Sequence, residues 1–322
     1  MNENVKNSKP NLKAKLKTVS RKVWQRRVSY LFIIPALVWF TIFCYVPILG
    51  VVVSIKEFSF QGGIWGSAIA EPWYKWYELF LTSNSFWIIV KNTVVVSLLK
   101  LITGFPAPII LALMLNEVRN KHFKKTVQTI SYLPYFVSWV IVAAMMNQLL
   151  TPYGGQGPLN KIIQLLTGSE NPKYIFGAKE YFYPLILLTN VWKGVGWGSI
   201  VYLAAITGVN PSLYEAAALD GAGRFRMMWN ITLPSIKTTI GLLFILALGG
   251  IMSAGYDQIY VFMTPGNYDY SNVLDIYIIE NGINNARYEI ATAAQFFQSV
   301  IALAFVLIGN YVSDKTTGVS LW

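Results

Sequence analysis

Charged residues are scarce in this chain. Only 13% of its 322 residues are Asp, Glu, Lys or Arg, while 54% are hydrophobic and 15% are aromatic. A soluble domain normally has charge on about a quarter of its residues, so this composition excludes an ordinary soluble fold. The chain instead contains long apolar runs, which indicate an integral membrane protein.

Residues that commonly hold metals or perform catalysis are nearly absent. The chain has one cysteine, Cys44, and one histidine, His122. A single cysteine cannot form an internal disulfide, and no zinc-type spacing occurs, so we expect no metal site. No nucleophile and base form a recognisable catalytic pair. The sequence G-x-x-x-x-G-K-[ST] is absent as well, which excludes a P-loop ATP site in this chain.

The net charge of +11 is concentrated near the N-terminus. Nine of the 26 Lys and Arg residues lie in the first 29 positions, directly before a hydrophobic run. A basic stretch in this position is typical of a cytosolic anchor on anionic lipid, and it also influences membrane topology. The distribution therefore favours contact with membrane lipid over a nucleic-acid partner.

Six apolar segments are long enough to cross a bilayer, which requires about 20 residues each. The first is too long for a typical signal-peptide core, so we interpret it as a retained helix. The second and fifth have Pro or Gly interruptions, which neighbouring helices or cavity water can accommodate. We therefore predict an all-α integral membrane protein with six transmembrane helices, at about 30–54, 86–115, 128–150, 184–208, 236–262 and 290–312.

The basic residues also predict the orientation of these helices. With the N-terminus inside, the cytosolic segments and their borders hold 17 basic residues and the external segments hold six. Basic residues favour the cytosolic side, so we predict that both termini and residues 209–235 are cytosolic. The predicted domains are a basic tail, a first helix with its external loop, a five-helix core and a cytosolic C-terminal tail, at residues 1–29, 30–85, 86–312 and 313–322.

Residues 215–234 read EAAALDGAGRFRMMWNITLP, and small residues are frequent in this loop. Ser212 and Glu215 have the S-x-x-E spacing of a capping box, which predicts a short helix through the alanines. Gly221 can end that helix in a left-handed conformation, and Pro234 suits the first turn of the next helix. The alternative is an amphipathic loop on the lipid surface, but its carboxylates fit a protein partner better than an anionic membrane.

The skeleton of this loop closely resembles the EAA loop of ABC-type importer membrane subunits, which docks on a separate ATPase. Its anchors are Glu215-Ala216-Ala217, Gly221, Ile231 and Leu233-Pro234. Together with further matches, the chain is similar to the carbohydrate-uptake, maltose-type branch of the MetI-like superfamily, and most similar to its LplB-like permeases for polysaccharides and oligosaccharides. The further matches are Asn92-Thr93, Asn210-Pro211-Ser212-Leu213-Tyr214-Glu215 and Asp257-Gln258-Ile259-Tyr260.

The resemblance implies a transport subunit of the bacterial plasma membrane and not an enzyme. Such a permease works as a heterodimer with a second permease subunit and takes its carbohydrate substrate from an extracellular sugar-binding lipoprotein. Two ATPase subunits bind ATP and Mg²⁺, so this chain would need no cofactor. The docking residues carried over to this sequence are Glu215, Ala216, Ala217, Asp220, Gly221 and Arg224.

Sugars are bound by aromatic faces and polar side chains, and the last three predicted helices contain both. The fourth helix has glycines that allow close helix approach and an intramembrane lysine, which indicates function by default. The alternative is that Lys193 reaches the headgroups near the external surface. The other polar residues either line a cavity or bond other helices. The candidates for the substrate path are Trp192, Lys193, Trp197, Tyr256, Asp257, Gln258, Gln295 and Gln298.

Two other functions remain open at this point. An ABC importer of a non-sugar solute would have the same loop, although abundant Trp, Tyr, Gln and Asn favours sugar. A secondary transporter typically has inverted repeats and carboxylates at the membrane midplane, and the predicted helices have almost no central acidic residue.

Overall fold

The computed structural model describes residues 24–152, 157–168 and 174–321. This part of the chain is helical and contains no β-strand, and its one isolated bridge pairs Lys56 with Ile69. The predicted all-α class is therefore confirmed.

The chain separates into two compact units. The first comprises the described residues up to Val53 together with Phe58–Ser67, and the second comprises Ser54–Glu57 and the described residues from Ala68 onward. A 3₁₀ segment links them along the chain. The helices before the second unit are α2 (Arg27–Phe40), a π-helical turn (Thr41–Tyr45), α3 (Val46–Ile48), the 3₁₀ segment (Leu49–Ile55) and α4 (Gly63–Gly66).

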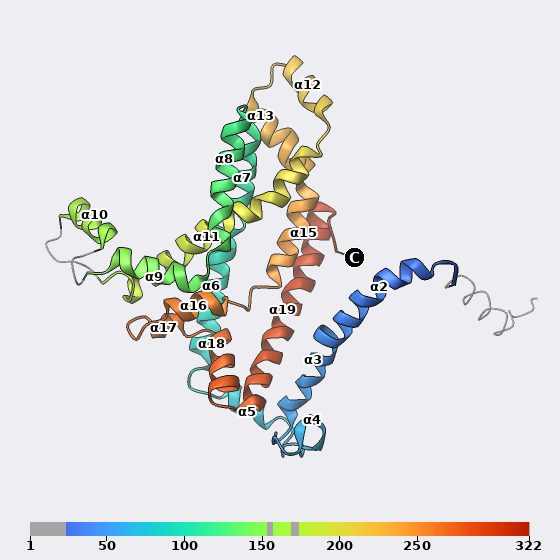
Figure 1. Ribbon diagram of the computed structural model, residues 1–322, viewed down its shortest axis with the longest axis vertical. Helices are drawn as coiled ribbons and strands as arrows, with labels where there is room; N and C mark the ends of the chain where they lie inside the picture. The colour runs from blue at the N-terminus through green and yellow to red at the C-terminus, as the bar shows by residue number, and fades with distance from the viewer. Residues whose placement is uncertain (1–23, 153–156, 169–173, 322) are drawn as a thin grey trace, which may run out of the picture. The chain divides into compact units, whose positions relative to one another are not determined.

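The second unit holds the remaining helices. Figure 1 shows α6, α7, α15 and α19 running along its length, with α12 at one end. In chain order its helices are α5 (Lys75–Leu81), α6 (Phe86–Gly104), α7 (Pro106–Glu117), α8 (Lys121–Tyr132), the 3₁₀ turn η3 (Leu133–Phe136), α9 (Trp139–Leu150), α10 (Pro158–Thr167), α11 (Lys179–Thr207), α12 (Pro211–Leu219), α13 (Arg224–Met227), the π turn η4 (Met228–Thr232), α14 (Leu233–Ser235), α15 (Lys237–Leu248), α16 (Tyr256–Phe262), α17 (Tyr268–Ser271), α18 (Leu274–Ile279), the π turn η5 (Glu280–Asn284) and α19 (Tyr288–Thr317).

Among the described residues, three helices are long and apolar enough to cross a membrane. They are Arg27–Ile55, Phe86–Glu117 and Tyr288–Thr316. These helices match the first, second and sixth predicted segments. The second consists of α6 and α7. Pro106 occupies the first turn of α7, where a backbone N–H has no partner within the helix, so the proline does not remove a helical hydrogen bond.

Two further candidate spans are bent helix pairs. Lys121–Phe136 and Trp139–Leu150 meet at 99°, and Arg224–Ser235 and Lys237–Leu248 meet at 62°. The first bend falls where the Ser138 hydroxyl accepts the Ile141 N–H at 3.3 Å and so starts a new helix. With each pair counted as one span, the described residues contain up to five spans by length and composition, where the sequence predicted six.

The fourth and fifth predicted segments differ most from simple apolar spans. α11 is a single helix of 29 residues, but it is not among the candidate spans. The segment 236–262 is interrupted, because α15 ends at Leu248 and α16 begins only at Tyr256. Gly255 has a φ of +87° directly before α16, a conformation that favours glycine.

The second unit packs around α11, which contacts α6, α7, α8, α15 and α16. Two of its glycines allow this close packing. A Cβ atom at Gly196 would lie 2.0 Å from the backbone oxygen of Ser131, and one at Gly198 would lie 2.9 Å from Cγ of Pro108. The expectation that glycines in this helix permit close approach is therefore confirmed at these two positions.

Two buried side chains of α6 fix the segment between α16 and α19. The Asn92 amide donates to the backbone oxygens of Asp269 at 2.7 Å and Asn272 at 3.0 Å. The Thr93 hydroxyl accepts the Leu274 N–H at 2.7 Å. These bonds hold the start of α18, and with it the carboxylate of Asp275, beside α6.

Candidate substrate path and coupling loop

A cavity of about 610 Å³, here called the aromatic cavity, brings together three of the predicted path residues. Its walls come from η3 and the start of α9, from α11 and from α16. Aromatic side chains predominate, and a cation and a carboxylate accompany them. The lining residues are Tyr135, Phe136, Val137, Ser138, Trp139, Val140, Lys193, Tyr256, Asp257, Tyr260 and Val261.

Lys193 lies against the aromatic wall of this cavity. Its Nζ donates to the backbone oxygen of Tyr135 at 2.5 Å. The same atom lies 5.2 Å from the ring centroid of Tyr135 and 5.3 Å from that of Trp139, within cation–π range. The ammonium is therefore held at the turn between η3 and α9.

Two stacked pairs of rings supply flat faces near the cavity. Trp197 stacks on Tyr135 with ring centroids 4.6 Å apart, and Tyr256 stacks on Tyr260 with centroids 5.1 Å apart. Trp197 is 44% exposed and Tyr260 is 47% exposed, so each keeps surface that a ligand can cover. Flat rings beside hydrogen-bonding groups form a surface that suits a sugar.

Four aromatic residues of the cavity were absent from the predicted path. Tyr135, Phe136 and Trp139 belong to the bend before α9, and Tyr260 follows Tyr256 by one helical turn. Tyr256 and Tyr260 have the i, i+4 spacing of one helix face, so the sequence alone could have placed both rings together. The other three enter the cavity only because the chain bends by 99°, which the sequence did not predict.

Two predicted path residues are tied into the protein instead. The buried Gln258 amide donates to the backbone oxygen of Ile186 and to the Thr189 hydroxyl, both at 2.9 Å. The buried Gln298 amide donates to the backbone oxygen of Met252 at 2.6 Å. In this structure both side chains bond neighbouring segments, which is the second of the two roles expected for them.

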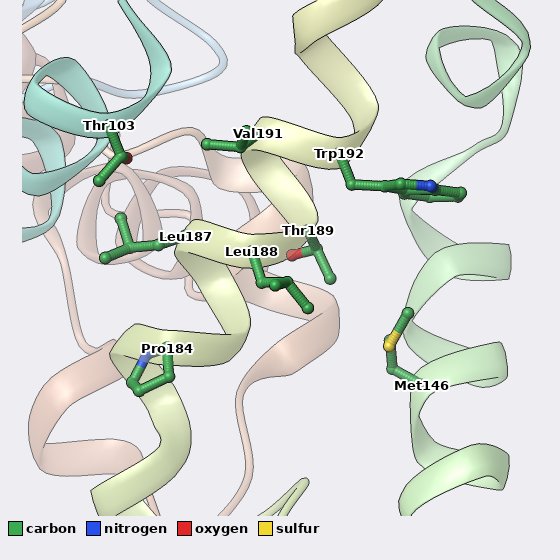
Figure 2. Close-up of a pocket in the computed structure, with 8 residues that line it drawn as sticks. All are labelled: Thr103, Met146, Pro184, Leu187, Leu188, Thr189, Val191 and Trp192. Atoms are coloured by element: carbon green, nitrogen blue, oxygen red, sulfur yellow. The ribbon is translucent and has the colours of Figure 1, made fainter. Parts of the chain in front are cut away.

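The remaining two candidates line separate cavities. Gln295 borders a cavity of about 250 Å³ together with Asp275 and Gln298. Trp192 borders a cavity of about 570 Å³ between α6, α9 and α11, and Figure 2 shows its ring extending from α11 toward α9. The walls of the larger cavity are apolar apart from two threonines: Thr103, Met146, Pro184, Leu187, Leu188, Thr189, Val191 and Trp192.

The loop 209–235 begins with α12, whose N-terminal cap differs from the prediction. The side chain of Asn210 accepts the Ser212 N–H at 3.0 Å, and Pro211 occupies the first helical position. The predicted capping box of Ser212 and Glu215 is therefore wrong. Proline favours the first position of a helix, so the helix starts two residues earlier, at the Asn210 cap.

Gly221 ends α12 in the conformation predicted from the sequence. Its φ is +74°, in the left-handed region. The N–H of Ala222 donates to the oxygen of Ala217 at 2.9 Å, and the N–H of Gly221 donates to that of Ala218 at 3.1 Å. This pair of bonds is a Schellman motif, which satisfies the last carbonyls of the helix.

The second part of the loop is helical from Arg224 to Ser235 and includes the π turn η4. Pro234 lies in the first turn of α14, as predicted for a helix start, and α15 begins at Lys237, one residue after the predicted start of the fifth segment. A hydrogen bond of 3.0 Å joins the Tyr214 and Thr232 hydroxyls and ties α12 to η4. The two parts of the loop are thus held together.

The loop presents a mixed apolar and charged surface. Leu219 is 90% exposed, Phe225 is 71% exposed and Trp229 is 57% exposed. Large exposed apolar side chains in one short segment commonly mark an interaction site. Of the six predicted docking residues, Ala217 is half-buried and the others are exposed: Glu215, Ala216, Asp220, Gly221 and Arg224.

Membrane-length helices, an aromatic cavity and an exposed helical loop are the features expected of a membrane transport protein. Residues 104–317 match the family described as "Binding-protein-dependent transport system inner membrane component". The match covers about two thirds of the chain, and the chain belongs to this family. It is a membrane permease of ABC importers, and ATP hydrolysis belongs to a separate subunit.

Two relatives from Bacillus subtilis (strain 168) are similar over nearly their whole length. "Polygalacturonan/rhamnogalacturonan transport system permease protein YteP" is 39% identical over 305 residues, which are 94% of this chain and 92% of the relative. "Protein LplB" is 39% identical over 288 residues, 89% of this chain and 88% of the relative. The predicted resemblance to LplB-like permeases is confirmed.

Solved structures agree with these relatives. A chain of a bacterial ABC transporter "involved in the import of the acidic polysaccharide alginate" is 38% identical, with a TM-score of 0.82 over 93% of this chain and 99% of that chain. A second structure of a bacterial alginate ABC transporter, in complex with an alginate pentasaccharide-bound periplasmic protein, gives a TM-score of 0.83 and 38% identity over 94% of this chain and 99% of that chain.

Proposed function

We propose that this chain is the permease subunit of an ATP-driven importer of oligosaccharides or polysaccharide fragments. The observation that carries the proposal is the 39% identity to a polygalacturonan and rhamnogalacturonan permease over 94% of this chain. The aromatic cavity supports it, because stacked rings with nearby charged groups suit a sugar better than an ion. The runner-up is an importer of a non-sugar solute, and nothing in the cavity favours it.

The proposal includes six membrane crossings with both termini in the cytosol. In it α11 forms the fourth crossing, and α15 with α16 forms the interrupted fifth. The excess of basic residues in the proposed cytosolic segments, 17 against six, supports this orientation. The domains are a basic tail, a first helix with its external loop, a five-helix core and a short C-terminal tail, at 1–29, 30–85, 86–312 and 313–322.

The proposed assembly has a second permease subunit, two ATPase subunits and an extracellular sugar-binding lipoprotein. This chain supplies half of the translocation path, and the ATPase subunits bind ATP and Mg²⁺. The solved alginate importer in complex with its periplasmic protein supports a binding-protein partner, since its permease chain is 38% identical to this one.

The loop 209–235 is proposed to couple ATP hydrolysis to transport. Exposed Leu219, Phe225 and Trp229 would enter a cleft of the ATPase, while Glu215, Asp220 and Arg224 would form polar contacts around them. Closure of the ATPase dimer would then move the loop and switch the path between inward-facing and outward-facing states. Such a switch requires that the path bind sugar with different affinity in the two states.

The test of this function is sugar-stimulated ATP hydrolysis by the purified assembly. The permease, its partner permease, the ATPases and the binding protein are reconstituted in lipid nanodiscs, and oligosaccharides are compared with peptides and polyols of similar size. We expect that only oligosaccharides stimulate hydrolysis. Stimulation by a non-sugar solute alone would replace the proposal with its runner-up.

A further inference from the structure

A cavity of about 300 Å³ lies beside Lys100, between α6, α11 and the segment 249–255 that joins α15 to α16. We name it the lysine cavity. It is separate from the aromatic cavity and shares no lining residue with it. The side chains in its wall that can form hydrogen bonds are those of Ser97, Lys100, Asn190 and Ser253.

Lys100 has unused hydrogen-bonding capacity toward this cavity. Its Nζ donates to the backbone oxygen of Ala254 at 2.5 Å, and within the described residues this is its one hydrogen bond. A lysine ammonium has three N–H donors, so two of them remain. Asp275 and Lys100 do not form an ion pair.

Two other polar groups of the wall also have no protein partner among the described residues. The Ser97 hydroxyl is buried and makes no hydrogen bond. The Asn190 side chain also lines the cavity; it is half-buried and makes no hydrogen bond within the described residues. A buried polar group without a partner costs free energy, so the Ser97 hydroxyl at this cavity points to a bound polar species.

The chemistry of the wall selects the kind of ligand. The spare ammonium protons, the serine hydroxyl and the asparagine amide can all donate, and none of the described residues that line the cavity is a carboxylate. The oxygens of Asp275 are already used by the Ala254 N–H, the Ser253 hydroxyl and the Gln298 amide. An anionic acceptor would provide hydrogen-bond partners for these donors, and a carboxylate can accept with two oxygens.

The position of the cavity connects it to the path. Asn190 of the lysine cavity and Lys193 of the aromatic cavity are three residues apart on α11, so they lie on one side of that helix. Ser253 lines the lysine cavity only three residues before Tyr256, which lines the aromatic cavity. A sugar chain whose rings stack in the aromatic cavity could therefore place a neighbouring substituent beside Lys100.

We propose that Lys100, Ser97 and Asn190 form a subsite for the carboxylate of a sugar-acid residue, which makes the importer selective for uronic-acid oligosaccharides. This inference rests on the proposed function, because it assumes that a sugar occupies the path. The subsite adds a specificity-determining contact to the stacking surface of the aromatic cavity.

The experiment compares two trisaccharides that differ only in charge. The purified assembly of this permease, its partner permease and the ATPases, without binding protein, is held in nanodiscs in chloride-free buffer. Trigalacturonate and its carboxyl-reduced form, the corresponding galactotriose, are titrated by calorimetry. We expect the wild-type assembly to bind the charged sugar about tenfold more tightly, since charge-assisted hydrogen bonds are the strong ones.

Two substitutions test the assignment. Asn190→Asp leaves the bond between Lys100 and Ala254 intact but adds a carboxylate of nearly the same shape to the wall. Lys100→Met removes the cation. Each should abolish the preference for the charged trisaccharide over the neutral one. The matched control is Lys91→Met, which removes an exposed lysine of the same helix outside the cavity and should keep the preference.

The outcomes separate the two proposals. Equal affinity of the wild-type assembly for both trisaccharides, or an unchanged preference in Asn190→Asp, would overturn the carboxylate subsite and leave the proposed function standing. Failure of both sugars to bind would overturn the carboxylate subsite, whereas the proposed function is decided separately by the comparison of oligosaccharides with peptides and polyols. If Lys100→Met prevents assembly, because its bond to Ala254 is lost, the Asn190→Asp result decides.

Discussion

The carboxylate of Asp275 accepts a hydrogen bond from the backbone N–H of Ala254 at 2.7 Å, in the break between α15 and α16. On the other side of the same residue, Lys100 donates to the Ala254 oxygen at 2.5 Å. One peptide segment is thus held between an anion and a cation. Because α15 follows the loop 209–235 and α16 carries Tyr256 of the aromatic cavity, this joint connects the proposed coupling surface to the proposed path.

Loss of the Asp275 carboxylate should loosen this joint. Asp275→Ala leaves the buried Ala254 N–H without its acceptor, at a cost of about 1–3 kcal/mol, and it also removes the acceptor of the exposed Ser253 hydroxyl. We expect a lower thermal unfolding temperature of the purified assembly and slower sugar transport. Asp269→Ala, which removes an exposed carboxylate of α17, is the matched control. Equal unfolding temperatures and transport rates in the two variants would contradict the role given to Asp275.

The stacked pair of Trp197 and Tyr135 leads to a second prediction. If sugar covers the exposed face of Trp197, then Trp197→Ala should weaken the apparent affinity for sugar by up to about 1–3 kcal/mol, by analogy with aromatic stacking on nucleic-acid bases. Assembly with the ATPase should be unchanged. The control is Trp87→Ala on α6, where a tryptophan is 76% exposed and lines none of the cavities described above. Unchanged transport in Trp197→Ala would assign this ring to helix packing alone.

The membrane topology can be tested with cysteines placed at exposed positions in a Cys44→Ser background. Lys161 in α10 and Asn285 after η5 are exposed, and both lie on the proposed external side. Cysteines there should react with an impermeant thiol reagent in intact cells, whereas a cysteine at exposed Ser212 should react only after the cells are opened. The reverse labelling pattern would reject the proposed orientation.

Local chemistry explains which features the sequence could predict. The left-handed Gly221 follows a short helix of small residues, so the ending of that helix depends on neighbouring residues alone. Continuous apolar runs likewise gave the three long helices, because length and composition decide whether a helix can span. The cap at Asn210 was missed because Ser212 also has the spacing of a capping box. Pro211 favours the first helical position, so the helix begins after Asn210.

Features that depend on distant residues could not be predicted in the same way. The break after α15 is held by Lys100, Asp275 and Gln298, which come from three other helices. The aromatic cavity joins Tyr135 to Tyr260 across more than a hundred residues of sequence. Hydropathy records composition along the chain, so it contains no information on these contacts.

The left-handed Gly221 gives the sharpest test of coupling. A side chain at a φ of +74° strains the backbone by about 1–2 kcal/mol, although a Cβ there would meet no atom within 4 Å. Gly221→Asp should therefore tilt the two parts of the loop relative to each other without affecting membrane insertion. We expect loss of ATPase binding or of sugar-stimulated ATP hydrolysis, measured by co-purification and by a parallel transport assay.

The chain offers a matched control for this variant in the same loop. Gly223 has an ordinary φ of −72° and equally open surroundings, so Gly223→Asp adds the same bulk and charge without backbone strain. If the backbone conformation at Gly221 positions the loop, Gly221→Asp should impair coupling much more than Gly223→Asp. Equal impairment in both variants would mean that the added charge, and not the backbone geometry, disturbs the ATPase contact. Full ATPase recovery with full transport in Gly221→Asp would remove the loop from the coupling role.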